Sequence, residues 1–572
     1  MHDRGIRVRI LLVTAALLLA LFGLASRLAY LHLANHSKLT REYRRTLLGL
    51  RGRIFDCNGD RFPMAVSLPA RQFFLDPQSV KPQHDKKQIA ETVATCLGLE
   101  TDEVYAQFTR KDSRYIKLGI SLNDKVFDLL SDPDAISGIG SEDLVCRSYP
   151  QGRRMSHVLG FVNDMGVGGA GIEQQFNRYL TGTPGLIEGE KDAGRREIWS
   201  RRTVHVPAIA GSDLYLTLDH NIQYEVEQAL CEVVEKFEAV GGWAIVQRVR
   251  TGEILAMASF PDFAPEQYTE ESVDVWRNSA LAIVYEPGSI MKAVTVAAAL
   301  NERIVTPETV IDVGEGCWMY AGKPLRDHVH GRINVSTALK KSSNIACAKI
   351  GLMLGNKRLE TYLRAFNFGE KLGIELPGEE RGILARARDW DKLKPTRIPI
   401  GQGVAVTGLQ MISAYSTLAN DGVMMKPHLV RRIVSASGET IFEAKPEVLG
   451  RPVRPEVARV VREMLRGVTE EGGTGKRASV PGYSIGGKTG TAQKAVPGGY
   501  SSTDYYASFV GFVPAGEPVF SVLVSVERPR PQHTGGFVSA PAFAKIAAAT
   551  ARYLEVPPDQ LSEEEEQVAN HP

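Results

Sequence analysis

The sequence predicts an α+β protein with a membrane-spanning N-terminal helix, an elongated domain of mixed α/β structure, and an antiparallel sheet packed on helices. Three observations lead to this prediction. An uncharged apolar run extends from Ile10 to Ala25. Segments that alternate like strands open and close the C-terminal half of the chain, and apolar segments of helical spacing lie between them. Strands at both ends of a helical region are typical of an antiparallel sheet covered by helices.

The composition is that of a globular chain with several domains. The 572 residues exceed one ordinary domain, and 43% of them are hydrophobic. The 68 lysines and arginines nearly balance the 66 aspartates and glutamates, and no basic stripe contains interleaved aromatic residues, which argues against nucleic-acid binding. The six cysteines lie far apart and form no CxxC or Cys/His cluster, which argues against a zinc site or a disulfide framework. No motif requires a metal or an organic cofactor.

The N-terminal apolar run is predicted to be an uncleaved membrane anchor. Only Arg27 interrupts the apolar residues up to Leu33, so the run can cross a bilayer with some tilt. A cleaved signal peptide is the alternative, although the run is long for one and no small-x-small cleavage site follows. Basic residues stand on both sides of the run and do not orient it, but the short tail in front favours the bulk of the chain outside the cytoplasm.

The region after the anchor is predicted to form the elongated mixed domain. Residues 48–67 contain an Asn-Gly turn between two short strand-like segments, and a second organised block spans residues 147–182. Short helices and loops fit the residues between them. A strand at 212–219 and a helix over "NIQYEVEQALCEVVEKF" then lead toward the last domain.

The last domain is predicted to begin with a hairpin over residues 241–261 and to end with strands and a closing helix. The strands fit "YSIGGKTGTAQK", "YYASFVGFVP" and "VFSVLVSVERP", and the helix fits "APAFAKIAAATARYL". The predicted division of the whole chain is a tail and anchor at 1–34, a mixed domain at 35–230, a C-terminal domain at 231–555 and an acidic disordered tail at 556–572.

Ser289 and Lys292 form the first candidate site. The Pro-Gly turn of "YEPGSIMKAV" runs into a helix that is apolar nearly all round, which predicts burial. A lysine three residues after a serine shares its helix face and can approach its hydroxyl. Burial lowers a lysine's pKa so that the amine can accept a proton, and a helix N-terminus can stabilise an oxyanion. The other interpretation is a helix cap with a solvated lysine, because S-x-x-K also occurs by chance.

Two further motifs favour the catalytic interpretation. Ser342 and Asn344 stand before another apolar helix in "LKKSSNIACAKIGLML", where a helix cap alone would require no function. Lys488 begins a K-T-G sequence in the strand "GGKTGTAQK". S-x-x-K, S-x-N and K-T-G in this order are typical of penicillin-binding proteins and class A β-lactamases.

Nearly the whole chain resembles the class B penicillin-binding proteins, which are membrane-anchored bacterial peptidoglycan D,D-transpeptidases. The motifs "RGRIFDCNG", "RSYPQG", "SHVLGF" and "GIEQQF" are similar to those of the family's pedestal (dimerisation-type) domain, with Cys57 where an arginine is usual. The motifs "LTLDHNIQ", "TGEILAMASFP", "RNSALAIVYEPGS" and "EGGTGKRA" are similar to those of its transpeptidase domain. The resemblance implies a pedestal at 35–230 and a penicillin-binding, serine β-lactamase-like transpeptidase fold at 231–555. The short pedestal favours the cell-division (septal) type.

The resemblance implies a role for each of five catalytic residues. Ser289 attacks the penultimate D-Ala carbonyl of a stem peptide, and Lys292 takes its proton. Ser342 protonates the leaving D-Ala. Asn344 and Lys488 complete the network that moves protons and binds the substrate.

The K-T-G segment is implied to bind the substrate through Thr489, Gly490 and Thr491, with both threonine hydroxyls on the terminal carboxylate. The backbone N–H groups of Ser289 and Thr491 are implied to form the oxyanion hole. An amine of a neighbouring stem peptide then closes the cross-link, and whether that amine belongs to diaminopimelate or lysine stays open. β-Lactams mimic D-Ala-D-Ala and are expected to acylate Ser289.

Other functions share some of these motifs. An elongation-type transpeptidase, a D,D-carboxypeptidase, a β-lactamase and a β-lactam sensor all use the same chemistry. A catalytically silent scaffold of the division complex is the alternative from another class, and the intact motifs argue against it. The resemblance implies a single-pass protein of the bacterial cytoplasmic (inner) membrane, with its bulk on the periplasmic side. Its implied partners are a SEDS-type glycosyltransferase and other division membrane proteins.

Overall fold

The computed structural model describes residues 2–34, 41–59, 61–82, 84–110, 112–130, 136–192, 197–497 and 499–560. The chain divides into two compact units, each assembled from separate stretches of sequence. Unit 1 contains residues 1–51, 69–145 and 181–211, and unit 2 contains residues 52–68, 146–180 and 212–572.

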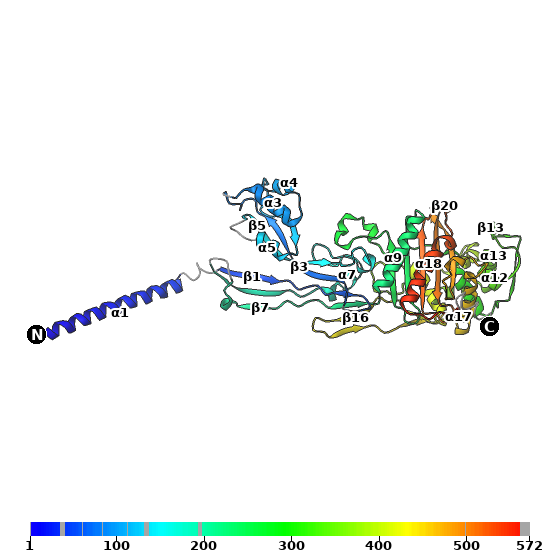
Figure 1. Cartoon of the computed structure of the whole chain (residues 1–572). Helices are drawn as coiled ribbons and strands as arrows, with labels where there is room; N and C mark the ends of the chain where they lie inside the picture. The colour runs from blue at the N-terminus through cyan, green and yellow to red at the C-terminus, as the bar shows by residue number, and fades with distance from the viewer. Residues whose placement is uncertain are drawn as a thin grey trace, which may run out of the picture. The chain divides into compact units, whose positions relative to one another are not determined.

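Helix α1 (His2–Ala34) contains the predicted anchor (Figure 1). The most apolar 18 residues of its segment Gly5–Leu31 have a mean hydropathy of 2.4, and none of them is buried within the chain. Among the described helices it is the one long and apolar enough to cross a membrane. Apolar side chains that contact nothing in their own protein are more stable in lipid than in water, so the helix fits a membrane anchor.

Unit 1 has mixed α/β structure. One part is an antiparallel sheet in the order β1-β6-β7 (Arg41–Leu47, Gly185–Lys191 and Val204–Val206), with the short helix η1 (Trp199–Arg201). A second part packs helices on paired strands around a small apolar core that contains Phe73, Val93 and Phe108. Its elements are β3 (Pro63–Leu75), α3 (Lys86–Leu97), α4 (Thr101–Gln107), β4 (Ile116–Ser121), α5 (Asp124–Leu130) and β5 (Ile139–Ser148); the first residues of β3 and the last of β5 belong to unit 2.

Unit 2 begins with the predicted pair of short strands. β2 (Ile54–Phe55) pairs antiparallel with the first residues of β3, and parallel with β8 (Asp213–Leu216). β8 in turn pairs with β16 (Val430–Val434), which pairs with β17 (Thr440–Glu443). Three short helices follow from the block at 147–182: α6 (Ser156–Leu159), α7 (Gly171–Gln175) and α8 (Asn177–Leu180). Segments far apart in the sequence therefore build this part together.

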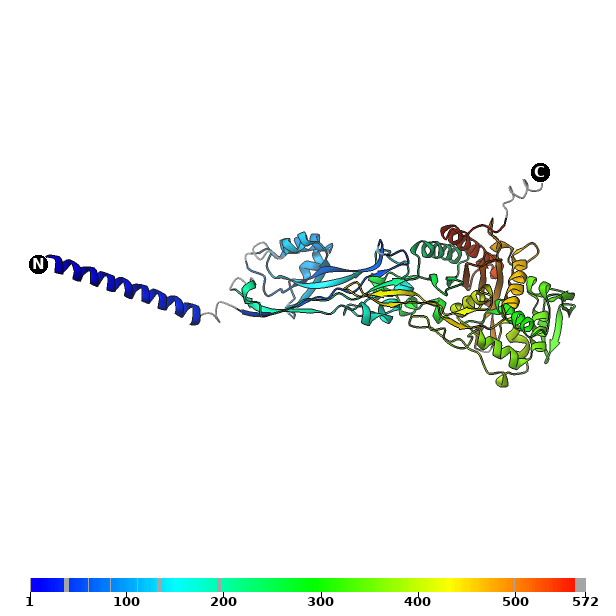
Figure 2. The same cartoon turned by 90° about the horizontal axis from the view of Figure 1, so that it is seen from below.

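The main sheet of unit 2 is the predicted antiparallel sheet, which Figure 2 shows among the helices of the C-terminal part of the chain. Its strands lie in the order β10-β9-β21-β20-β19. Its strands come from both ends of the C-terminal region: β9 (Gly241–Arg248), β10 (Ile254–Phe260), β19 (Gly486–Val496), β20 (Gly499–Val513) and β21 (Phe520–Glu527). Successive side chains of a strand face opposite sides of a sheet. Trp243 and Ile245 accordingly join the core on one face, and Ala244 and Val246 join the core on the other.

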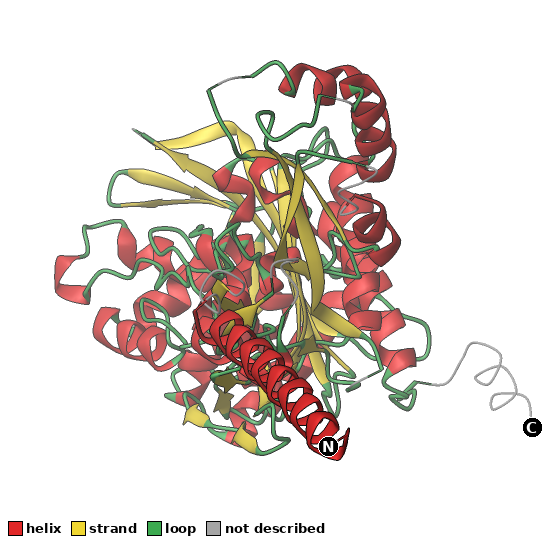
Figure 3. Cartoon of the chain, turned by 90° about the vertical axis from the view of Figure 1, so that its left-hand side faces the viewer, coloured by secondary structure: helices red, strands yellow, loops and turns green. Residues whose placement is uncertain are grey.

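Helices cover both faces of this sheet (Figure 3). Helices α9 (His220–Lys236) and α18 (Gly535–Tyr553) share one core with it, and the helical middle of the domain shares the other. The α-helices of that middle are α10 (Ser279–Ala282), α11 (Lys292–Asn301), α12 (Val335–Lys340), α13 (Asn344–Leu354), α14 (Asn356–Ala365), α15 (Lys394–Arg397), α16 (Gly408–Ala419) and α17 (Pro455–Thr469). The predicted α+β fold class is confirmed.

Short elements interrupt the helical middle. The strands are β11 (Val310–Gly314), β12 (Cys317–Tyr320), β13 (Lys323–Arg326), β14 (Gly331–Asn334), β15 (Met424–Met425) and β18 (Val448–Gly450). The short helices are η2 (Pro265–Glu270), η3 (Val273–Trp276), η4 (Gly288–Met291), η5 (Ala387–Asp389), η6 (Ile398–Ile400) and η7 (Lys476–Ala478). Strands β12 and β13 form an antiparallel hairpin that we did not predict.

Two of the predicted domain limits differ from the structural elements. The limit between residues 230 and 231 falls inside α9, which follows the cap residue Asp219 and packs on β10 and α18. The predicted disordered tail begins at Val556, but Val556 is buried and Asp559 accepts a hydrogen bond from Ser484 N at 2.7 Å. Residues 556–560 therefore belong to the folded unit, and the acidic run at 562–572 lies outside the described residues.

Candidate active site

Ser289 stands in η4, at the point where the chain enters α11. Gly288 has a φ of 57°, and its N–H donates to the Gly401 carbonyl at 3.0 Å. A Cβ on Gly401 would lie 2.1 Å from the Gly288 oxygen, and a Cβ on Gly288 would lie 3.1 Å from Ala492 Cβ on β19. Glycine at both positions therefore lets three segments approach closely, and this holds the half-buried Ser289 in place.

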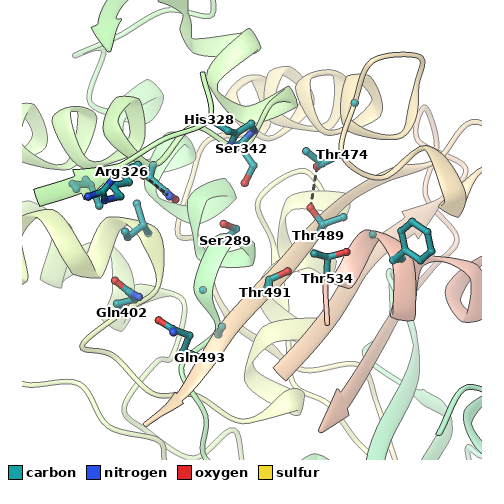
Figure 4. Close-up of a pocket in the computed structure, with 18 of the residues that line it drawn as sticks. Ser289, Arg326, His328, Ser342, Gln402, Thr474, Thr489, Thr491, Gln493 and Thr534 are labelled. Carbon is teal, nitrogen blue, oxygen red and sulfur yellow. Dashed lines mark hydrogen bonds between the residues drawn. The ribbon is translucent and has the colours of Figure 1, made fainter. Parts of the chain in front are cut away.

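Ser289 opens into a cavity of about 870 Å³ in unit 2 (Figure 4). Four other predicted site residues line the same cavity: Ser342, Asn344, Thr489 and Thr491. Lys292 and Lys488 are fully buried and do not line it. The structure thus brings all three motifs together from segments about 50 and 150 residues apart.

The amine of Lys292 contacts three oxygen atoms. Nζ donates to the Ser342 carbonyl at 2.6 Å and to Asn344 Oδ1 at 2.7 Å, and it lies 3.1 Å from Ser342 Oγ. A carbonyl and an amide oxygen only accept, so they hold two of the amine's protons, whereas the hydroxyl can also donate. We predicted a contact between Lys292 and the Ser289 hydroxyl, but no hydrogen bond joins these groups within the described chain. The two carbonyl-type oxygens draw the buried amine toward the S-x-N segment.

Burial shifts both lysines toward the neutral form. It lowers the pKa of Lys292 from 10.5 to about 8, and the nearby Cys347 and Asp327 oppose that shift. Burial, followed by the charge of Lys292, holds the pKa of Lys488 well below 10.5. The Lys488 amine donates to Thr489 O at 3.2 Å. All six cysteines are free, so Cys317 and Cys347 do not pair.

The S-x-N segment has a strained backbone that neighbouring groups support. Ser342 has a φ of 60°, in the left-handed region that costs a non-glycine residue about 1 kcal/mol or more. Ser343 caps α13 by accepting a hydrogen bond from Ala346 N at 3.1 Å. The amide of Asn344 donates to the Arg326 carbonyl at 3.1 Å, which links the segment to the β12–β13 hairpin. Ser343 is therefore the helix cap, whereas Ser342 and Asn344 line the cavity.

The K-T-G strand presents its two threonines to the cavity. Thr489 Oγ1 is 2.9 Å from Thr474 Oγ1 (Figure 4). Gly535 N donates to Thr491 Oγ1 at 3.1 Å. Gly490, which we predicted among the substrate-binding residues, does not line the cavity. A Cβ on Gly490 would lie 3.1 Å from Ile290 Cγ2, so the glycine gives the nucleophile turn room to pack against the strand. Ile290, at the variable position after Ser289, is fully buried there.

Sequence reasoning missed Asp327 and Thr474. Asp327 has a fully buried side chain, and its Oδ2 accepts hydrogen bonds from Ser343 Oγ and Ile345 N. Thr474 lies in "EGGTGKRA", which marked the family but gave no role to a particular residue. Each belongs to a segment separated from the motif that it contacts, and no local pattern predicts such contacts.

A second polar cluster lies outside the cavity. Ligand-type atoms of Asp56, Asp219 and His220 lie within 4.8 Å of one another. Their hydrogen bonds already account for the arrangement: His220 Nδ1 is 2.5 Å from Asp56 Oδ2, and Asn58 Nδ2 donates to both carboxylates. Cys57 donates to Asp219 Oδ2 at 3.4 Å, and burial raises its pKa.

Comparison with known families supports this assembly of motifs. Residues 242–548 match the penicillin binding protein transpeptidase domain, and residues 46–216 match the penicillin-binding protein dimerisation domain. The dimerisation match ends at residue 216 and the transpeptidase match begins at residue 242, so the first domain precedes the second along the chain.

Named relatives match over most of their length. The chain is 32% identical over 524 residues to stage V sporulation protein D of Bacillus subtilis, covering 89% of this chain and 79% of the relative. It is 30% identical over 577 residues to peptidoglycan D,D-transpeptidase FtsI of Escherichia coli, covering 98% and 94%. The structure of penicillin binding protein 3 from Mycobacterium tuberculosis complexed with aztreonam has a TM-score of 0.70 and 28% identity, covering 91% of this chain and all of that one. The chain therefore belongs to the class B penicillin-binding proteins, of the septal type.

Proposed function

We propose that this chain is a serine-type peptidoglycan D,D-transpeptidase that cross-links stem peptides in septal cell-wall synthesis. The observation that carries the proposal is the position of Ser289. It lies at the start of a buried helix and lines the cavity, and Lys292 is buried one helical turn later. Burial of that lysine makes a proton acceptor available near neutral pH.

In the acylation step, Ser289 Oγ attacks the carbonyl carbon of the penultimate D-Ala. The hydroxyl proton passes to Lys292, directly or through Ser342 Oγ, which lies 3.1 Å from Nζ. The N–H groups of Ser289 and Thr491 stabilise the oxyanion that forms. The C–N bond to the terminal D-Ala then breaks, and Ser342 gives the leaving amine a proton. Lys292 then passes the proton that it took from Ser289 to Ser342.

In the second step, the ester is transferred to a neighbouring stem peptide. The acceptor amine attacks the ester carbon, its proton returns through Lys292, and Ser289 leaves with a proton. Thr489 and Thr491 hold the terminal carboxylate during acylation, and Asn344 and Lys488 keep the proton network in place. A β-lactam enters by the same acylation step, but its leaving group stays attached, so the acyl-enzyme persists.

The test is labelling of the full-length protein in detergent with a fluorescent penicillin. Stable label on the wild type over hours and none on Ser289→Ala would support the proposal, whereas rapid release would indicate a β-lactamase. Ser272→Ala is the matched control, because Ser272 is exposed and does not line the cavity. No label on a folded wild type would leave only the scaffold function.

We further propose that α1 holds the protein in the bacterial cytoplasmic membrane as a single-pass anchor, with the catalytic unit on the periplasmic side. The family membership and the apolar outer surface of α1 support this proposal. A SEDS-type glycosyltransferase and other division membrane proteins are the proposed partners. Co-purification from detergent-solubilised membranes, with and without residues 1–34, tests this assignment.

A further inference from the structure

The charged side chains that line the active-site cavity are all basic. They are Arg326, Lys476 and Arg477, with His328 beside them. Among the described residues that line the cavity, none is an aspartate or a glutamate. A cleft lined by charge of one sign focuses its field on the bound ligand, so this cavity favours an anionic peptide.

Arg477 lies on the wall that binds the terminal carboxylate in the proposed function. It follows Thr474 in the same segment, and Thr474 contacts Thr489. Its guanidinium stacks on the exposed ring of Phe537, 3.4 Å from the ring centroid. Lys476 is ion-paired with Glu471, so its charge is partly balanced. Arg477 is thus the main cation beside the site for the first carboxylate.

Arg326 lies elsewhere in the cavity. Figure 4 shows Arg326 and Thr489 on either side of Ser289. Arg326 ends β13, and its carbonyl accepts the hydrogen bond from Asn344 that ties the hairpin to the S-x-N segment. Its guanidinium forms no ion pair with any acidic residue that the structure describes. A second arginine, Arg397, donates to the Pro324 carbonyl of the same strand and adds positive charge there.

We propose that Arg326 binds a second free carboxylate of the donor stem peptide, on the side chain of the residue that precedes D-Ala-D-Ala. This inference rests on the proposed transpeptidase function. It assigns the donor to the diaminopimelate class with that side-chain carboxylate free, rather than to amidated or lysine-type stems. A guanidinium offers a planar pair of N–H donors that matches a carboxylate, which makes Arg326 suited to this task.

The three donor classes differ in the charge that they bring toward Arg326. The side chain of diaminopimelate carries an ammonium and a carboxylate, and its amidated form keeps only the ammonium. A lysine side chain also carries only an ammonium. The second and third donors would therefore place a positive charge among the cations of the hairpin with no carboxylate to balance it.

The experiment compares three synthetic pentapeptide donors that differ only in their third residue: diaminopimelate, its side-chain amide, and lysine. D-Ala release by the full-length protein in detergent is measured with a D-amino acid as acceptor. The free-carboxylate donor is expected to have a kcat/KM about tenfold or more above the other two. Arg326→Gln is expected to reduce that ratio to near one, and Arg326→Lys to an intermediate value. Lys323→Gln, on the same strand but outside the cavity, is expected to keep the wild-type ratio.

Benzylpenicillin acylation, followed by intact mass, distinguishes failure of this inference from failure of the proposed transpeptidase function. Equal use of the three donors by a wild type that benzylpenicillin acylates would overturn the inference and leave the transpeptidase function intact. A preference that survives Arg326→Gln would overturn the role of Arg326. If the folded protein showed neither penicillin acylation nor D-Ala release, the proposed function would be overturned, and the inference with it.

Discussion

Asp327 and Ser343 are joined by a 2.5 Å hydrogen bond, in which the buried carboxylate accepts from the serine hydroxyl. The same Oδ2 accepts from Ile345 N at 2.9 Å, and Oδ1 accepts from His328 N at 2.8 Å. Asp327 thus fixes the residues on both sides of Asn344, next to the strained backbone of Ser342. It is a positioning residue for the S-x-N motif, and its charge also acts on Lys292.

Asp327→Asn is expected to slow β-lactam acylation by about tenfold. The amide has one accepting oxygen in place of two, so at least one buried donor loses its partner, at a cost of about 1–3 kcal/mol. The variant also removes a negative charge that raises the pKa of Lys292, so the pH midpoint of acylation is expected to move down. Stopped-flow measurements with a chromogenic cephalosporin across pH 6–10 give both quantities.

Asp312→Asn is the matched control for that measurement. Asp312 is exposed on β11, and its side chain accepts a hydrogen bond from Gly314 N at 2.8 Å that an amide oxygen can keep. It should leave the rate and the midpoint unchanged. An Asp327→Asn variant with a slower rate but an unmoved midpoint would mean that Asp327 acts only on the shape of the segment.

The pH dependence of the wild type follows from the burial of Lys292. Only the neutral amine accepts a proton, and burial lowers its pKa from 10.5 to about 8. The acylation rate is therefore expected to rise with pH through about 8 and to level off above it. A midpoint at or above pH 10, where a solvated lysine titrates, would contradict a role for buried Lys292 as the base.

Gly401→Ala is expected to abolish penicillin acylation and to lower the melting temperature. Gly401 has a φ of 80°, and its new Cβ would lie 2.1 Å from the Gly288 oxygen, so the turn that presents Ser289 must move. Gly438→Ala separates this clash from backbone strain, because Gly438 has a φ of 87° and open space around it. That control should cost about 1 kcal/mol of stability and should keep acylation. Equal effects of the two variants would show that strain, not contact, dominates.

The three motifs could be predicted because each is a short pattern whose residues act close together. The spacing of Ser289 and Lys292 on one helix, and the alternation that presents Thr489 and Thr491, are set by local geometry. The supporting contacts could not be predicted in this way. Asp327 reaches Ser343 from a separate turn, and no sequence pattern near either residue reports that contact.

The same distinction applies to the fold. The antiparallel sheet could be predicted because its strands are long, apolar runs with turn residues between them. The β12–β13 hairpin lies among helices. None of the four residues of β12 and only one of the four residues of β13 is buried, so the hairpin lacks the apolar alternation of a sheet strand. The position of α9 depends on its packing against β10 and α18, which come from distant parts of the chain. For that reason a limit drawn from local patterns fell inside the helix.

The buried ion pair of Arg147 and Glu173 offers a last prediction, on stability. Nε lies 2.6 Å from Oε1, and the two side chains are only 5% and 0% exposed. Arg147 also donates to the Gly52 carbonyl at 2.8 Å and to Ser67 Oγ at 3.2 Å. The pair therefore ties two separated stretches of unit 2, residues 52–68 and 146–180, to each other. Glu173→Ala leaves a buried guanidinium without its carboxylate, and is expected to cost on the order of 3–5 kcal/mol.

A double variant distinguishes the strength of the pair from the penalty of breaking it. Two methionines at these positions remove both charges and keep apolar volume, so Arg147→Met with Glu173→Met should unfold at a higher temperature than Glu173→Ala. The exposed pair of Arg153 and Asp262 is the control, and Arg153→Ala should cost less than about 1 kcal/mol. If the double variant were less stable than the single one, the net attraction of the two charges would exceed their desolvation penalty. The pair would then be a source of stability in itself, rather than a device that fixes where these segments meet.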